Sequence, residues 1–358
     1  MSLMHVSSPH VHKPVSSVEQ VMKQVLLATI PGVLVLTWFF GPGTIINIVF
    51  GSALALAFEA WALWLRGKDY KTPLRDHSVI VTATLLCIAL PPYAPWWLIA
   101  VGIGVSVLLG KHVFGGLGYN PFNPAMVGYV VLLVSFPLQM SSWTEPRGIG
   151  EVPGLVDAFT ALFAASSYDA VTAATPLDLF RQNSGMLFDD LMQSGAELTG
   201  PIAGLGWDWV NLAFLAGGIW LLRQRIFTWH APVGMLAALT ICAALGYDDG
   251  SSTGGGSVLF HLFSGATMFG AFFIITDPVS SAVSNKGRLI FGAMVGILVY
   301  LIRVHGNYPD AVAFGVLLLN FAAPLIDQYT QPTVYGTKKV EVDECCLLYT
   351  SPSPRDRH

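Results

Sequence analysis

The sequence has little charge. Only 11% of its 358 residues are Asp, Glu, Lys or Arg, whereas soluble domains carry roughly 25%. Hydrophobic residues make up 53% of the chain, together with 36 glycines and 22 prolines. Both of these residue types are commoner in membrane helices than in soluble ones. The composition therefore argues against an ordinary soluble domain and predicts an all-α polytopic membrane protein embedded in a lipid bilayer.

Other features are scarce as well. No run of Lys and Arg indicates a nucleic-acid partner, and the net charge is only −4. Cys87 and Cys242 lie in apolar segments, while Cys345 and Cys346 are adjacent, which is poor geometry for a shared disulfide. We therefore expect no metal site and no redox cysteines. The style of residues 345–358 differs from the rest, and we interpret them as a non-native tail.

Long apolar runs are abundant. A helix needs about 20 apolar residues to cross a bilayer, and residues 1–21 lack a signal-peptide cleavage pattern, so the first run is expected to be a retained span. The runs predict about ten spans, of which the third and fifth are short or carry Gly and Pro near their ends. These spans are 22–41, 44–65, 77–92, 95–114, 123–140, 206–222, 229–247, 257–276, 288–304 and 309–326.

Positive charge alternates along the connections. Lys and Arg follow the even-numbered spans, the odd-numbered connections are nearly free of them, and Arg303 is the exception. Because positive residues mark the cytoplasmic side, we expect both termini in the cytoplasm. The basic residues that carry this pattern are Arg66, Lys68, Lys71, Arg75, Lys111, Arg223, Arg225, Lys286, Arg288, Lys338 and Lys339.

One connection is long, and it divides the chain. Residues 141–205 are predicted to face outward, between two sets of five spans at 22–140 and 206–327. The sixth span starts on the opposite side from the first, which is the topology of an inverted repeat, whose functional sites lie between the halves. Residues 328–344 are then a cytoplasmic C-terminal segment.

The long connection contains the sequence YDAVTAATP at residues 168–176. An ordinary interpretation is a turn or a helix start, because Thr175 precedes a proline, which favours an extended residue. A hydroxyl on an exposed loop among small neighbours also suits a modification site.

Two further segments and one carboxylate are candidates. Residues 110–125 are rich in Gly, Asn and Pro and form either a tight turn or an unwound segment that lines a cavity. Residues 261–278 contain small residues that favour close helix packing. Glu59 lies inside a span, where a carboxylate is either a functional group or one that reaches the interface or an ion-pair partner.

At these residues the chain resembles the D subunits of the Rnf (also called Rsx) ion-translocating oxidoreductases and, more distantly, the B subunits of sodium-pumping NADH:quinone reductases. The resemblance runs from residue 8 to about residue 336. It includes GGLGYNPFNPA at residues 115–125 and AFFIITDP at residues 271–278. It implies an architecture like that of urea transporters. It also implies a location in the bacterial inner membrane, with the long connection in the periplasm.

The resemblance also implies a covalent FMN. In this family a separate flavin transferase joins FMN phosphate to a threonine oxygen, and Asp169, Thr172 and Ala174 match the recognition motif that precedes the acceptor, Thr175. Ala173 stands where glycine is common. The string SGAT at residues 264–267 is a closer literal match to the end of the motif, but it lies within a predicted span, out of reach of a soluble transferase.

The implied function is that of a membrane subunit, not catalytic alone, of a complex that couples flavin-mediated electron flow of the NADH and ferredoxin type to the movement of Na⁺ or H⁺. Its partners would be the other subunits of the complex. Segment 110–125 is a candidate for a second, non-covalent flavin or for the ion route, through Gly115, Gly116, Gly118, Asn120 and Asn123. Three alternatives stay open: a flavin-free inverted-repeat transporter or channel, a B subunit of the related sodium-pumping NADH:quinone reductases, and a structural scaffold.

Overall fold

The computed structural model of the protein is built mainly of helices. It describes residues 17–68, 74–163, 172–182, 200, 202–247, 256–306, 308 and 311–330. The expectations that fall on Asp169, on residues 1–16 and on residues 331–358 lie outside this range.

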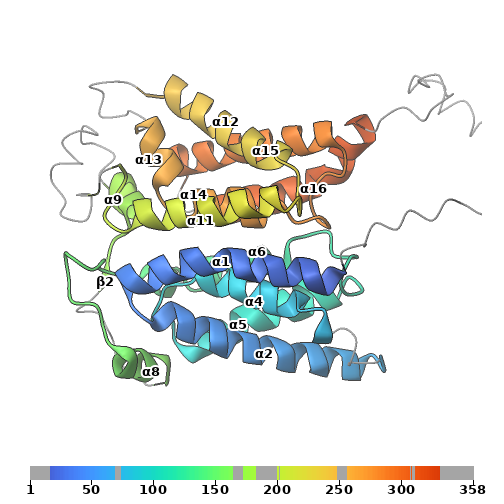
Figure 1. The fold of residues 1–358 in the computed structure, drawn as a ribbon, viewed down its shortest axis with the longest axis horizontal. Coiled ribbons are helices and arrows are strands. Elements are labelled where there is room, and N and C mark those ends of the chain that lie inside the picture. The colour runs from blue at the N-terminus through green and yellow to red at the C-terminus, as the bar shows by residue number, and fades with distance from the viewer. Residues whose placement is uncertain are drawn as a thin grey trace, which may run out of the picture.

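The first half of the chain forms one layer of helices, drawn in blue to teal in Figure 1. Helix α1 starts with a capping box in which the Ser17 hydroxyl accepts from the Gln20 amide and the Gln20 side chain accepts from the Ser17 amide. The helices of this layer are α1 (Val18–Phe40), α2 (Gly43–Leu65), α4 (Ser78–Ala89), α5 (Trp96–Gly104), the π-helix η1 (Val105–His112) and α6 (Pro124–Ser135).

The second half forms another layer, drawn in yellow to red. Helix α11 lies against α1 of the first layer and runs in the opposite direction, and the Phe214 ring occupies the space left by the missing side chain of Gly32. The elements of this layer are α11 (Trp207–Arg223), α12 (His230–Leu245), α13 (Val258–Phe263), α14 (Thr267–Phe269), the π-helix η3 (Gly270–Ile274), α15 (Asn285–His305) and α16 (Val312–Thr330).

The connection between the layers is partly structured, and it adds a small sheet to a fold that we expected to be all helical. Its elements are α7 (Pro137–Ser141), β1 (Trp143–Thr144), α8 (Leu155–Phe163), β2 (Thr172–Ala173) and α9 (Pro176–Gln182). Strands β1 and β2 pair antiparallel, with Trp143 opposite Ala173 and Thr144 opposite Thr172.

Helix lengths bear out a polytopic membrane protein. Among the described residues four helices, α1, α2, α15 and α16, are long and apolar enough to cross a membrane, and several shorter apolar helices accompany them. Helix α1 exposes one apolar face, made of Leu27, Ile30, Leu34 and Trp38, as expected for contact with lipid. The count of ten spans and the boundaries of the two halves stay predictions.

The predicted eighth span is not a single helix, which corrects the expectation of a continuous, closely packed segment at 257–276. It is interrupted between α13 and α14, where Ser264 is extended and Gly265 has a φ of +56°. A left-handed residue of this kind favours glycine and ends the helical hydrogen-bond ladder. Close packing does occur beyond the interruption, because a Cβ on Gly270 would lie 2.6 Å from Val312 Cγ1.

The two sides of the layers are distinct. The start of α1 and the end of α16 lie at one side, while α8, α9 and β2 gather at the other (Figure 1). We call these the terminal side and the loop side. The predicted topology requires the start of α1 and the end of α16 to lie opposite the long connection, as they do among the described residues. Which side faces the cytoplasm stays a prediction.

Close backbone approach between α12 and α15 generates a stability prediction. A Cβ on Gly296 would collide with the carbonyl oxygen of Met235, whereas a Cβ on Gly315 in α16 would meet its neighbours at an ordinary 3.7 Å. We expect Gly296→Ala to lower the free energy of unfolding by about 1–3 kcal/mol through overpacking. Gly315→Ala is the matched control and should be neutral or stabilising, by up to about 1 kcal/mol. Thermal unfolding of the purified variants in detergent measures both, and equal stability of the two would contradict the prediction.

Candidate functional site

A large cavity opens between the layers on the loop side. Its volume is about 670 Å³, within the range of roughly 300–1,000 Å³ usual for ligand sites. Helices of both layers and the segment around α9 supply its walls. The residues that matter below are Leu36, Tyr129, Trp143, Ala174, Thr175, Asp178, Arg181, Trp207, Phe214, Gly265, Ala266, Phe269 and Tyr308. We call it the loop-side cavity.

Thr175 lies at the wall of this cavity as the N-cap of α9. Its hydroxyl donates to the Asp178 carboxylate at 2.7 Å, and its Oγ accepts from the Asp178 amide at 3.2 Å. The same carboxylate accepts from the Thr175 amide at 3.2 Å. The arrangement is a capping box, which explains locally why α9 starts here. It also holds the hydroxyl of Thr175 at the cavity, where the side chain is partly exposed.

The structure describes only some of the other residues of the recognition motif. Ala174 lines the loop-side cavity, and Thr172 belongs to β2, which pairs with β1 next to the Trp143 wall of the same cavity. Asp169 lies outside the described residues. The short sheet therefore fixes the chain immediately before Thr175.

Thr267, the threonine of the competing SGAT string, has a different environment. It is fully buried. Its hydroxyl lies 2.9 Å from the carbonyl oxygens of His261 and Ser264, and its Oγ accepts from Arg303 at 2.9 Å. The hydroxyl is thus enclosed within the second layer and satisfied by its own segment.

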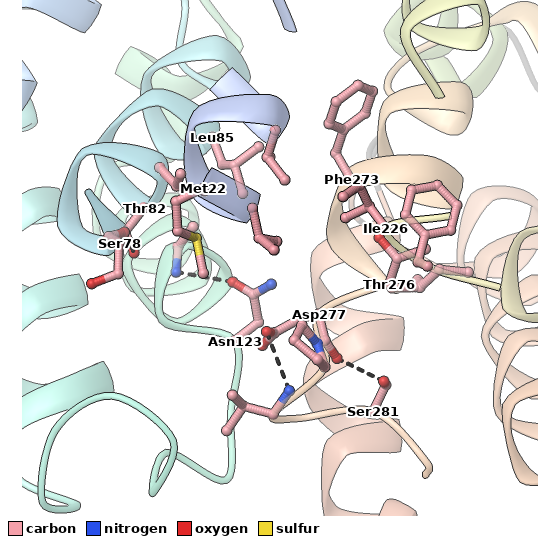
Figure 2. Close-up of a pocket in the computed structure, with 18 of the residues that line it drawn as sticks. Met22, Ser78, Thr82, Leu85, Asn123, Ile226, Phe273, Thr276, Asp277 and Ser281 are labelled. Atoms are coloured by element: carbon pink, nitrogen blue, oxygen red, sulfur yellow. Dashed lines mark hydrogen bonds between the residues drawn. The ribbon is translucent and has the colours of Figure 1, made fainter. Parts of the chain in front are cut away.

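A second cavity lies between the layers on the terminal side, and we call it the terminal-side cavity (Figure 2). Its volume is about 240 Å³. Apolar side chains such as Met22, Leu85, Ile226 and Phe273 form much of its wall, and polar groups from both layers face the same space. These polar groups are Ser78, Thr82, Lys111, Asn120, Asn123, Arg225, Thr276, Asp277, Ser281 and Arg288.

The Gly- and Asn-rich segment divides between its two interpretations. Gly115, Gly116 and Gly118 have positive φ angles and form a tight turn, whereas Asn120 and Asn123 line the terminal-side cavity. The Asn123 Oδ1 caps α6 by accepting from the amides of Ala125 and Met126 at 3.0 and 3.3 Å.

Asp277 follows the last turn of the interrupted helix and faces the terminal-side cavity. Its carboxylate accepts from the Ser280 hydroxyl at 2.6 Å and from the Val279 amide at 3.4 Å. Burial raises the pKa of this carboxyl, and the hydrogen bonds partly oppose that shift. Asp277 directly follows the predicted eighth span at 257–276, and it was not among the predicted site residues.

Glu59 is paired inside the first layer rather than reaching the interface. Its carboxylate accepts from Lys111 Nζ at 2.8 Å, and the ring Nε2 of His112 lies 2.9 Å from its other oxygen. Lys111 also donates to the Ser78 hydroxyl at 3.0 Å. Arg66 extends this network by donating to the Gly115 carbonyl at 3.1 Å, which ties down the glycine turn.

An aromatic cluster fills the space between the two cavities. Phe214 and Phe269 line the loop-side cavity, and Phe273 lines the terminal-side cavity. The ring centroid of Phe214 lies 4.9 Å from that of Phe269 and 5.8 Å from that of Phe273. The cavities therefore end on opposite sides of one apolar cluster.

Several contacts at these sites were not predicted from the sequence. Three sets of contacts were not predicted: those of Lys111 and His112 with Glu59, those of Asn211 with the carbonyls of Phe263 and Gly265, and that of Arg303 with Thr267. A polar residue within an apolar run was the available signal, since such residues are costly in a membrane and need partners. The partners themselves are far apart in the sequence, so only the folded chain reveals them.

Comparison with known proteins gives one consistent result. The family described as NQR2, RnfD, RnfE matches residues 4–336. Three similar proteins are named as the D subunits of ion-translocating oxidoreductase complexes. The one from Cellvibrio japonicus is 49% identical over the whole of both chains. The one from Ectopseudomonas mendocina is 53% identical over 95% of this chain and 97% of its own. The Escherichia coli O139:H28 protein is 47% identical over 93% of this chain and 98% of its own.

The buried network around Glu59 generates the next prediction. Removing one partner of a buried ion pair leaves the other charge uncompensated and costs about 3–5 kcal/mol. We therefore expect both Glu59→Gln and Lys111→Met to lower the free energy of unfolding by an amount of that order. The double variant removes both charges, so its loss should be much smaller than the sum, which a double-mutant cycle of unfolding free energies measures. Additive losses would show that the two side chains do not interact.

Proposed function

The chain belongs to the NQR2, RnfD, RnfE family, and from that premise we propose that it is the membrane subunit of a redox-driven ion translocase and carries a covalent FMN on Thr175. It is not catalytic alone: its proposed partners are the other subunits of an ion-translocating oxidoreductase complex and a flavin transferase that attaches the cofactor. The complex would couple electron flow of the NADH and ferredoxin type to movement of Na⁺ or H⁺.

The position of Thr175 at the wall of the loop-side cavity carries this proposal. The cavity volume of about 670 Å³ suits a flavin-sized ligand. Trp143, Trp207, Phe214 and Phe269 give it aromatic walls for a planar ring. Thr175 is partly exposed there, whereas the hydroxyl of Thr267 is enclosed.

The residues around Thr175 suit a phosphoester. Esterification removes the proton that Thr175 now donates to Asp178, while Oγ can still accept from the Asp178 amide. The phosphate would repel the Asp178 carboxylate, and the Arg181 guanidinium, which lines the same cavity, offers the compensating charge. A bound flavin supplies one- and two-electron transfer, and the protein holds its ring and excludes water from it.

The proposed orientation places the loop side in the periplasm of a bacterial inner-membrane protein. The basic residues that follow the even-numbered spans support it, because positive charge marks the cytoplasmic side. The opposite directions of α1 and α11 support two inverted sets of five spans, ten in all, in a layout like that of urea transporters.

The terminal-side cavity is the proposed place for a second, non-covalent flavin or for the ion route. Its apolar wall around Phe273 suits a ring, and the side chains of Asn120, Asn123 and Asp277 suit polar edges or an ion. Its volume of about 240 Å³ is slightly below the usual range for ligand sites, so a flavin there requires the cavity to widen.

The flavin site leads to a direct test. The chain made together with its flavin transferase should give a fluorescent band after denaturing electrophoresis, because an ester-linked flavin survives unfolding. Thr175→Ala should abolish that band. Thr267→Ala removes the competing threonine and should keep the fluorescence, provided that the variant is folded. Mass spectrometry should find the FMN phosphoester on a peptide that contains Thr175. A fluorescent Thr175→Ala band would disprove the site, and a non-fluorescent wild-type chain would disprove the cofactor.

The second flavin has a separate test. Denaturation of the purified chain should release free flavin in addition to the flavin that stays attached. The amounts of released and retained flavin per chain, measured by absorbance and mass spectrometry, should then be about equal. If no flavin is released from chains that were purified in their complex, the terminal-side cavity does not hold one, and the ion route is the remaining proposal for it.

A further inference from the structure

Helix α9, which starts at Thr175, rests on the interrupted helix of the second layer. Leu177 and Phe260 belong to one small buried cluster, and the Phe180 ring lies 5.3 Å from the Phe260 ring and 6.1 Å from the His261 ring. These contacts join the proposed flavin segment to α13, immediately before the interruption.

Helix α9 packs against the interruption itself. A Cβ on Gly265 would lie 2.5 Å from Leu177 Cδ1, so only the absence of a side chain leaves room for Leu177. Gly265 also has a φ of +56°, which other residues rarely adopt. Gly265 and Ala266 line the loop-side cavity together with Thr175. We call residues 264–267 the α9 seat.

Two buried side chains hold the α9 seat in its non-helical shape. The Asn211 amide donates to the carbonyls of Phe263 and Gly265 at 2.7 and 3.0 Å and accepts from the Met268 amide at 3.1 Å. The Arg303 guanidinium donates to the His261 carbonyl at 2.8 Å and to Thr267 Oγ at 2.9 Å. Together they satisfy backbone groups on both sides of the interruption.

Arg303 is placed to act on the cavity as well as on the backbone. One of its terminal nitrogens would lie 3.4 Å from a Cβ on Gly265, so a positive charge stands directly behind the cavity wall. It is only 3% exposed. A buried charge in a membrane span is costly and usually marks a functional site. The same residue was the exception to the alternation of positive charge.

We propose that Arg303 is a positioning residue for the flavin on Thr175. It fixes the α9 seat, the α9 seat fixes Leu177, and Leu177 fixes the start of α9 and with it the place of the flavin ring in the loop-side cavity. The charge of Arg303 behind the wall favours the reduced, more negative form of that ring. This inference rests on the proposed covalent flavin for its redox part, but the docking of α9 can be tested without it.

Hydrogen exchange of the full chain tests the docking. In Arg303→Gln the amides of residues 179–182 should exchange about tenfold faster, the ratio expected when a charge-assisted hydrogen bond is lost. Gly265→Val should have the same effect by displacing Leu177. The matched controls are Arg223→Gln, an exposed arginine, and Gly67→Val, which has a similar φ of +62° with nothing within 4 Å. Unchanged exchange in both Arg303→Gln and Gly265→Val would overturn the α9 seat.

The potential of the covalent flavin tests the electrostatic part. With flavin attached, Arg303→Gln should lower the midpoint potential, by about 30 mV for each tenfold loss of preference for a two-electron reduced form. Arg303→Lys keeps the charge and should restore most of the wild-type potential, which a purely structural role would not require. An unchanged potential in a fully loaded Arg303→Gln chain would overturn this role.

A wild-type chain without flavin would instead count against the proposed function, and the exchange measurement would still decide on the α9 seat. If Arg303→Gln fails to fold, hydrogen exchange in Gly265→Val tests the α9 seat, and the midpoint potential of Arg303→Lys tests the role of the charge.

Discussion

The structure depends on one constraint: backbone polar groups inside a membrane need partners within the protein. Continuous helices meet this constraint by themselves, but this chain interrupts or shortens several of its helices. At three such places a buried asparagine from another element supplies the missing hydrogen bonds. Asn47 donates to the carbonyls of Pro91 and Pro92 at 3.0 and 3.1 Å after α4 ends. Asn211 spans the interruption before α14, and Asn123 donates to the Ile274 carbonyl at 3.4 Å where η3 ends. Non-helical backbone is thus tolerated here because a neighbouring amide satisfies it.

The same interruptions create the two cavities. The ends of α4 and the break before α14 border the loop-side cavity, while the starts of α4 and α6 and the end of η3 border the terminal-side cavity. A layer of unbroken helices would bury its side chains against its neighbour and leave no room between them. The aromatic cluster of Phe214, Phe269 and Phe273 closes the space that remains between the two cavities. The arrangement gives the loop side and the terminal side one cavity each and keeps the two cavities apart.

Features with a local sequence pattern were predicted correctly, whereas features that depend on partners far apart in the sequence were not. Apolar runs predicted helices such as α1, α15 and α16 to within a few residues, because hydropathy over 20 residues needs no knowledge of the fold. The eighth span was wrong as a continuous helix, since the glycine at 265 and the small residues near it are equally compatible with close packing.

The partners of Glu59 were missed for a related reason. Lys111 and His112 are more than 50 residues away in the sequence, and the charge of Lys111 had been assigned to the cytoplasmic end of a span. The segment around Thr175 was found from its motif, but the loop-side cavity beside it comes from folding both halves together.

The buried charged side chains differ in the groups that they contact. Lys111 contacts one carboxylate oxygen of Glu59 and His112 contacts the other, so the charge of Glu59 is compensated within the first layer. Arg303 is turned toward a carbonyl and a hydroxyl of the interrupted helix, and its charge acts through the cavity wall. Asp277 accepts hydrogen bonds from its own turn, and its carboxylate faces the terminal-side cavity. Neutralisation inside the fold therefore makes Glu59 a poor candidate for direct contact with a moving ion or electron carrier. Asp277 shares the terminal-side cavity with Arg225 and Arg288. Asp178 and Arg181 line the loop-side cavity, and Arg303 lies behind its wall at Gly265.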